Sequence, residues 1–101
     1  METKIASQKL KEIILKKVQL KKEPGDNKQF TFFQNVFNFC LDQLEHEFRT
    51  LIINSYINCS FKFWWVDIYT RTTFYRMRAR ALSNFVSLFE LIYENIQDFK
   101  N

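Results

Sequence analysis

The residues best suited to bind a ligand lie in the segment DIYTRTTFYRMRARALSNF, residues 67–85. It combines three threonines with a group of four arginines, Arg71, Arg76, Arg78 and Arg80. Arginine and threonine side chains contact phosphates and base edges in nucleic-acid complexes. The segment predicts either a helix that docks nucleic acid or a core helix with a solvated basic face.

A helical projection of the segment separates an apolar side from a basic side. The apolar side is formed by Phe74, Met77, Ala81, Phe85, Leu88 and Ile92. Thr72, Arg76, Ala79, Arg80 and Ser83 fall roughly opposite, with Arg71, Tyr75 and Arg78 at the flank. Arg76 and Arg80 are one turn apart, where like charges repel mildly, so an anionic partner would stabilise this face. The alternative is that Asp67 and the acidic middle of the chain partly neutralise it.

The charge is unevenly distributed along the chain. Residues 1–22 carry seven lysines against two glutamates, and residues 60–80 carry five basic side chains against one acidic. Residues 23–59 between them carry five acidic side chains against two basic. Two basic segments around an acidic middle can focus a field toward a polyanion, but they are also common on lysine-rich surface helices.

Enzymatic and metal chemistry find little support. A single glycine excludes a glycine-rich phosphate loop. The only histidine, His46, lies six positions after Cys40, which puts the two on different faces of a helix. Asp67 is the only acid of the basic segment, so a nuclease is a minor third interpretation. We expect no enzyme, no cofactor, no metal site and no small-molecule substrate.

The composition predicts an all-α protein with one domain over residues 1–101. Hydrophobic residues make up 47% of the chain, 12 residues are Phe, and turn formers are almost absent, with one Gly and one Pro. We expect a basic amphipathic helix over 1–22, a turn at Pro24-Gly25, a central helix over 30–57, and a helix-turn-helix-like unit with a C-terminal helix over 63–99. The last comprises a short helix in FWWVDIY and a long helix with Thr70 as N-cap.

Two segments have alternative interpretations. The first helix places Ala6, Leu10, Ile13, Ile14 and Val18 on one face, which fits docking on the core or binding to a membrane surface or an acidic partner. Docking is favoured because no Trp or Phe anchors that face. Trp64 and Trp65 fit core anchors or an exposed patch that binds a protein.

The order of LEHEFRTLIINSYI, FWWVDIY and TRTTFYRMRARAL resembles the helix-turn-helix of the sigma-70 region 4 superfamily, over about residues 41–90. The pattern is most similar to phage ArpU-type and small sigma-like transcriptional regulators. The residues that match are Thr70, Arg71, Thr72, Thr73, Phe74, Tyr75 and Arg76, with Ala81 and Leu82 following. This resemblance implies that the helix from Thr70 enters the major groove of double-stranded DNA. Thr72, Thr73 and Arg76 would face base edges, and Arg71, Tyr75, Arg78 and Arg80 would clamp the backbone.

The end of the last helix has a second apolar pattern. Residues with the 3–4 spacing of a coiled-coil seam are Leu82, Phe85, Phe89, Ile92, Ile96 and Phe99. We expect a homodimer, with Phe85, Phe89, Ile92, Ile96 and Phe99 as the partner face, because a two-fold dimer would pair two recognition helices. The alternative is that the intramolecular bundle covers both faces.

Location follows from what the sequence lacks. The first residues lack the apolar region of a signal peptide, no run of 18 apolar residues occurs, and Cys40 and Cys59 form no CxxC pair. We expect a cytoplasmic protein with reduced thiols and no membrane segment. The sequence thus predicts an all-α, four-helix bundle-like domain that binds DNA as a transcriptional regulator. The alternative function is a protein–protein interaction or structural module with an aromatic docking surface.

Overall fold

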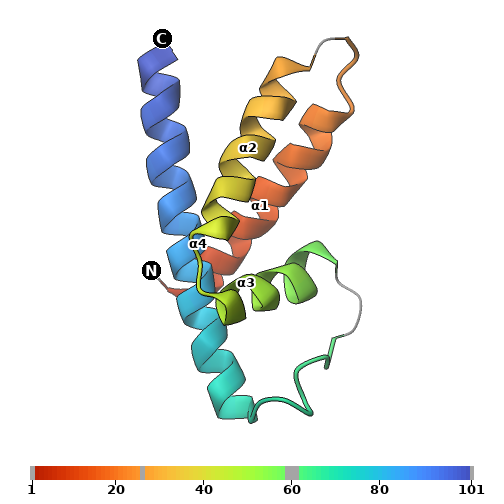
Figure 1. Ribbon diagram of the computed structural model, residues 1–101, viewed down its shortest axis with the longest axis vertical. Coiled ribbons are helices and arrows are strands. Elements are labelled where there is room, and N and C mark those ends of the chain that lie inside the picture. The colour runs from red at the N-terminus through yellow and green to blue at the C-terminus, as the bar shows by residue number, and fades with distance from the viewer. Residues whose placement is uncertain (1, 26, 59–61, 101) are drawn as a thin grey trace.

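The fold is all-α, as the sequence predicts. The computed structural model describes residues 2–25, 27–58 and 62–100, with side chains described up to residue 95. Within these ranges there is no strand (Figure 1). The helices are α1 (Thr3–Lys21), α2 (Lys28–Asp42), α3 (His46–Ile52), the π-helical turn η1 (Ile53–Ile57) and α4 (Arg71–Lys100).

The first two helices form a hairpin whose turn is closed by Asn27. The Asn27 side chain accepts a hydrogen bond from the Phe30 backbone N–H at 3.1 Å and so caps α2. Its amide also donates to the Leu20 carbonyl near the end of α1, which ties the two helices together. Gly25 supplies the left-handed conformation in the turn, with φ of 90°. The turn expected at Pro24-Gly25 is therefore confirmed.

The single central helix expected over 30–57 is wrong in one respect, because the chain breaks between α2 and α3. Gln43 ends α2, and Glu45 adopts an extended conformation before α3 begins. Leu44 is buried at this corner. No Gly or Pro marks the break. Its effect is that α3 packs against α4, while α2 stays beside α1 (Figure 1).

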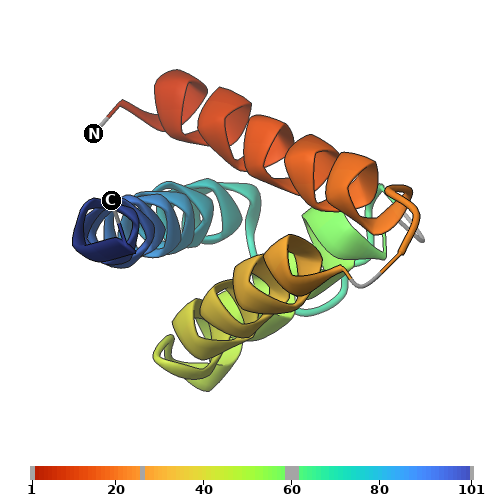
Figure 2. The same cartoon turned by 90° about the horizontal axis from the view of Figure 1, so that it is seen from above.

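Aromatic side chains of α2 and α4 form the centre of the core. Phe37 meets Phe85 edge-on with ring centres 5.1 Å apart, and Phe33 meets Phe89 edge-on at 5.2 Å. Such pairs contribute roughly 0.5–1.5 kcal/mol each beyond the area they bury. Seen from above, α1, α2 and α4 surround this region on three sides (Figure 2).

The partner face expected on α4 is therefore wrong for Phe85 and Phe89. Both are buried in the intramolecular core and cannot also line an exposed seam. Ile92 is partly buried against the same core. Ile96 and Phe99 lie among the helical residues whose side chains are not described.

The basic helix α1 docks on the core, which is the favoured interpretation of its sequence. Ala6 and Leu10 are buried, as expected. Val18 is exposed, and Leu20 is the buried residue near the end of α1. The lysines of α1 also make intramolecular contacts. Lys9 pairs with Glu90 at 3.0 Å, and Lys17 lies over the Phe37 ring at 4.6 Å. Burial, followed by the neighbouring charge of Lys21, lowers the pKa of Lys17.

Helix α4 runs along the whole molecule. Its 30 residues correspond to about 45 Å of helix, which matches the longest dimension of the molecule, 45 Å. The first turns of α4 project beyond the other helices at the lower end of Figure 1. The helices in the described part of the chain are all too short or too polar to cross a membrane.

Candidate functional site

The predicted N-terminus of α4 is confirmed in detail. The Thr70 side-chain oxygen accepts a hydrogen bond from the Thr73 backbone N–H at 3.2 Å, and its hydroxyl donates to the Thr73 hydroxyl at 2.9 Å. These bonds make Thr70 the N-cap, and α4 begins at Arg71. The cap fixes where the helix starts and hence the direction in which each arginine points.

Two arginines form an open basic face on the projecting part of α4. Arg76 and Arg80 are exposed, as are Thr72 and Thr73 beside them. We name Thr72, Thr73, Arg76 and Arg80 the outer face of α4. Between described residues the one ion pair is that of Lys9 and Glu90, so Arg76 and Arg80 have no acidic partner there. Pairing of the arginines with Glu45, Glu47 or Asp67, the alternative for a merely solvated face, does not occur.

The other two arginines are engaged by the fold. The Arg71 guanidinium lies over the Tyr75 ring, 5.8 Å from its centre. Arg78 is half-buried, and its Nε donates a hydrogen bond to the Tyr56 hydroxyl at 3.0 Å. The Ser7 hydroxyl lies 3.2 Å from the same oxygen, so Tyr56 links α1 to α4. Arg78 therefore differs from the arginines of the outer face, because part of its guanidinium is committed within the molecule.

The helix dipole adds to the attraction of this end of α4 for anions. The unpaired N–H groups of a helix N-terminus carry a partial positive charge, which acidic residues in the first turn commonly offset. The first turn of α4 contains no acidic residue, and Arg71 adds a full positive charge. Dipole and side chains thus have the same sign here.

The segment before α4 differs from the expected short helix. Residues 62–69 form successive turns, in which the Val66 N–H bonds to the Phe63 carbonyl at 3.1 Å and the Tyr69 N–H to the Trp65 carbonyl at 2.9 Å. The connection from η1 to α4 covers residues 58–70, compared with about three or four residues in a helix-turn-helix. The helices α3 and α4 do pack together, but through a longer linker than that motif has.

The two tryptophans are core anchors, the first of the two interpretations. Trp65 is buried and stacks on Phe74, with ring centres 4.2 Å apart and planes 7° from parallel. Trp64 packs edge-on against the same Phe74 ring at 6.0 Å. Its indole N–H donates to the Ser55 hydroxyl at 3.0 Å. The tryptophans thereby fasten the 62–69 segment to η1 and to the start of α4.

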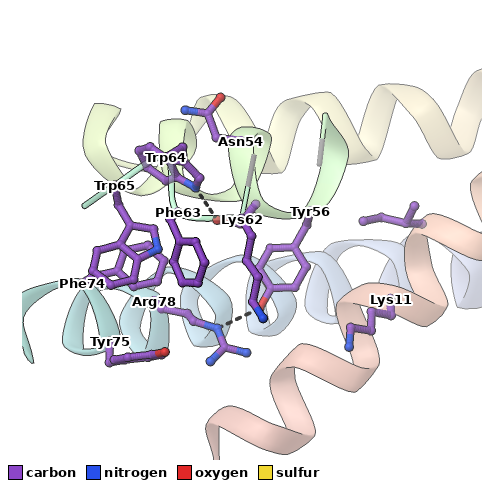
Figure 3. Close-up of a pocket in the computed structure, with 12 residues that line it drawn as sticks. Lys11, Asn54, Tyr56, Lys62, Phe63, Trp64, Trp65, Phe74, Tyr75 and Arg78 are labelled. Carbon is purple, nitrogen blue, oxygen red and sulfur yellow. Dashed lines mark hydrogen bonds between the residues drawn. The ribbon is translucent and has the colours of Figure 1, made fainter. Parts of the chain in front are cut away.

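A pocket of about 580 Å³ opens between α1, η1, the 62–65 segment and the first turns of α4 (Figure 3). Aromatic rings form one end, and basic groups from three different elements reach the other. Its aromatic lining includes Tyr56, Phe63, Trp64, Trp65, Phe74 and Tyr75. Its basic lining is Lys11, Lys62 and Arg78, and none of the described residues that line it is acidic.

The sequence pattern does not indicate this pocket. Of its lining, the sequence predicts only Tyr75 and Arg78 as DNA-binding residues, and it predicts the tryptophan pair as core anchors or a docking surface. The other contributors come from α1 and η1, far apart in the sequence from α4. In η1, three consecutive residues, Asn54, Ser55 and Tyr56, all line the pocket. Single-turn π-helices are frequent at functional sites, but no residue pattern here announces one.

The remaining candidate residues form no metal-binding group within the described part of the chain. No group of three or more His, Cys, Asp or Glu side chains is placed there to hold a metal ion. Cys40 is buried as a free thiol, and burial raises its pKa to about 11. Cys59 lies outside the described residues.

Comparison with known proteins gives no relative for this chain. No family model matches it, and neither a curated protein nor a solved structure matches it. The resemblance to sigma-70 region 4 therefore stays a prediction from the residues that match the pattern.

Proposed function

We propose that this protein binds double-stranded DNA through the N-terminal half of α4. The observation that supports it most is the outer face, where Arg76 and Arg80 are exposed on a projecting helix without an acidic partner among the described residues. A helix of this kind fits the major groove, whose width of about 12 Å admits one α-helix. The positive end of the helix dipole strengthens the attraction to phosphates.

The residues of α4 divide into two roles in this proposal. Thr72, Thr73 and Arg76 face base edges, while Arg71, Tyr75 and Arg80 contact the sugar–phosphate backbone. Arg78 is a positioning residue as well as a phosphate contact, because its bond to Tyr56 holds α4 against η1. The proposed role is that of a transcriptional regulator without an enzymatic step.

A homodimer remains part of the proposal in a changed form. With Phe85 and Phe89 buried, the described apolar residue on the outside of the C-terminal half of α4 is Leu91. A two-fold axis near this half of the helix would place two outer faces on one duplex.

The test is fluorescence anisotropy of a labelled duplex at several salt concentrations. Binding to phosphates releases counterions, so log K falls with log salt by about 0.9 for each phosphate neutralised. We expect Arg76→Ala/Arg80→Ala to weaken binding and to flatten this slope by about 1, because Arg80 is the phosphate contact of the pair. The matched control is Lys21→Ala/Lys22→Ala, which removes the same charge at the opposite end of the molecule. No binding at low salt, or equal effects of both variants, would rule out docking through the outer face.

A second candidate function has its own supporting observation. The 62–69 segment exposes three apolar side chains within six positions of one another: Phe63 at 52%, Val66 at 53% and Ile68 at 63%. Exposed apolar clusters of this type mark protein–protein contacts. If this is the functional surface, Phe63→Ser/Ile68→Ser will abolish partner binding while the response of the protein to duplex DNA stays unchanged.

A further inference from the structure

We infer that the pocket between α1, η1 and α4 binds a planar aromatic anion, with a nucleoside monophosphate as its simplest example. The inference does not depend on docking of duplex DNA by the outer face. The volume of the pocket, about 580 Å³, lies within the range of roughly 300–1,000 Å³ that is typical of small-molecule sites. Its two ends differ in chemistry in the way that such a ligand requires.

The aromatic end is a preformed surface for a planar ring. Stacking on Phe74 at 4.2 Å fixes Trp65, and the bond to Ser55 at 3.0 Å fixes Trp64. Phe63 is half exposed and lies between the aromatic and the basic end (Figure 3). Rings held in this way lose little conformational freedom when a ligand stacks on them, which favours affinity.

The basic end gathers three cations from three elements. Lys11 comes from α1, Lys62 from the connecting segment and Arg78 from α4. The Arg78 Nε is bonded to Tyr56, but its two terminal nitrogens have no hydrogen-bond partner among the described residues. With no acid in the lining, the three positive charges repel one another. A phosphate or carboxylate group relieves this repulsion and gains charge-assisted hydrogen bonds.

The ligand can come from two sources with the same chemistry. A free nucleotide or other aromatic acid is one, and an unpaired nucleotide of a single strand is the other. In both, the ring packs beside Trp64 and Phe63, and the anionic group lies among Lys11, Lys62 and Arg78. Single-strand-binding proteins combine stacking rings with a basic groove in this manner.

The test uses the intrinsic fluorescence of the intact protein. The chain contains two tryptophans, and both line the pocket, so a bound ring changes their emission directly. The probes are adenosine monophosphate, adenosine, inorganic phosphate and a short single-stranded oligothymidylate. We expect adenosine monophosphate to bind about ten-fold or more tightly than adenosine or phosphate alone, since each lacks one half of the recognition.

Variants separate the pocket from general charge attraction. Lys11→Ala/Lys62→Ala removes two exposed cations of the pocket and is expected to weaken binding about ten-fold or more, with unchanged helical circular dichroism. The control Lys21→Ala/Lys22→Ala removes equal charge elsewhere and leaves binding unchanged. Binding of the mononucleotide identifies a free aromatic anion, and binding of the oligonucleotide alone identifies a strand. No fluorescence response to either probe, or equal loss in both variants, overturns the inference.

Discussion

The replacement of Phe85 by alanine tests the packing at the centre of the molecule. Phe85 is 0% exposed and meets the Phe37 ring edge-on at 5.1 Å and the Phe89 ring at 6.1 Å. Removal of a buried Phe ring costs about 3–5 kcal/mol of unfolding free energy, because transfer energy is lost and a cavity remains. A small domain has roughly 5–15 kcal/mol in total, so the variant should fold but be strongly destabilised.

The assay is urea denaturation followed by helical circular dichroism. With a slope near 2 kcal/mol per molar urea, a loss of about 4 kcal/mol lowers the midpoint by about 2 M. The slope itself should not change, since the same surface is exposed on unfolding. If Phe85→Ala proves too unstable to fold, Phe85→Leu supplies the same test with a smaller loss, on the order of 1 kcal/mol.

The matched control is Leu15→Ala on α1, because Leu15 is 56% exposed. An exposed substitution of this kind changes the unfolding free energy by about 0.5 kcal/mol or less. The reasoning fails if Phe85→Ala costs no more than Leu15→Ala. It also fails if the midpoint of the unmutated protein rises with protein concentration and Phe85→Ala removes that dependence. The ring would then belong to a dimer seam, as the spacing in the sequence suggested.

Three further substitutions test the cap, the link between helices and the buried thiol. Thr70→Ala removes the N-cap of α4 and is expected to lower the free energy of unfolding by about 1 kcal/mol. This corresponds to a fall in Tm of about 4–8 °C. The control Thr72→Ala, at an exposed position, should leave Tm unchanged within the error of the scan. Tyr56→Phe removes the acceptor of the Arg78 bond and should cost on the order of 1 kcal/mol in thermal denaturation; an unchanged Tm would show that the bond contributes nothing. In a Cys59→Ser background, Cys40 should react with iodoacetamide at least about a hundred-fold more slowly than an exposed cysteine, because burial raises its pKa from 9.0 to about 11. A Cys40 thiol that reacts as fast as free cysteine would contradict its burial. The raised pKa of Cys40 also stabilises the fold below about pH 9, and this contribution is lost as the pH rises toward 11.

The sequence predicted those parts of the fold that depend on local pattern. The helical composition, the turn at Pro24-Gly25 and the N-cap at Thr70 are each encoded by residues within one or two turns of their position. The apolar side of α4 is likewise as expected, with Phe74, Ala81 and Phe85 buried.

The features that the sequence did not predict depend on contacts between distant segments. The apolar period continues from α2 into α3 without a Gly or Pro, so the break at Gln43–Glu45 appears only when α3 packs on α4. The a/d spacing around Phe85 and Phe89 cannot tell a dimer seam from a core face, because both need the same period.

The same limit applies to the candidate site. The outer face could be predicted, since Arg76 and Arg80 follow from helical spacing alone. The pocket could not, because Lys11, Tyr56 and Lys62 belong to three segments that only the fold brings together. The hydrogen bond from Arg78 to Tyr56 could not be predicted either, because it also joins segments that only the fold brings together.

The most direct test of the proposed function is a titration of isotope-labelled protein with a short DNA duplex, followed by the NMR shifts of backbone amides. Docking through the outer face predicts that the largest shifts lie between Thr70 and Arg80, and that Arg76→Ala/Arg80→Ala removes them. Shifts concentrated on the lysines of α1, or an unchanged spectrum at low salt, would contradict the proposal that α4 is the DNA-binding helix.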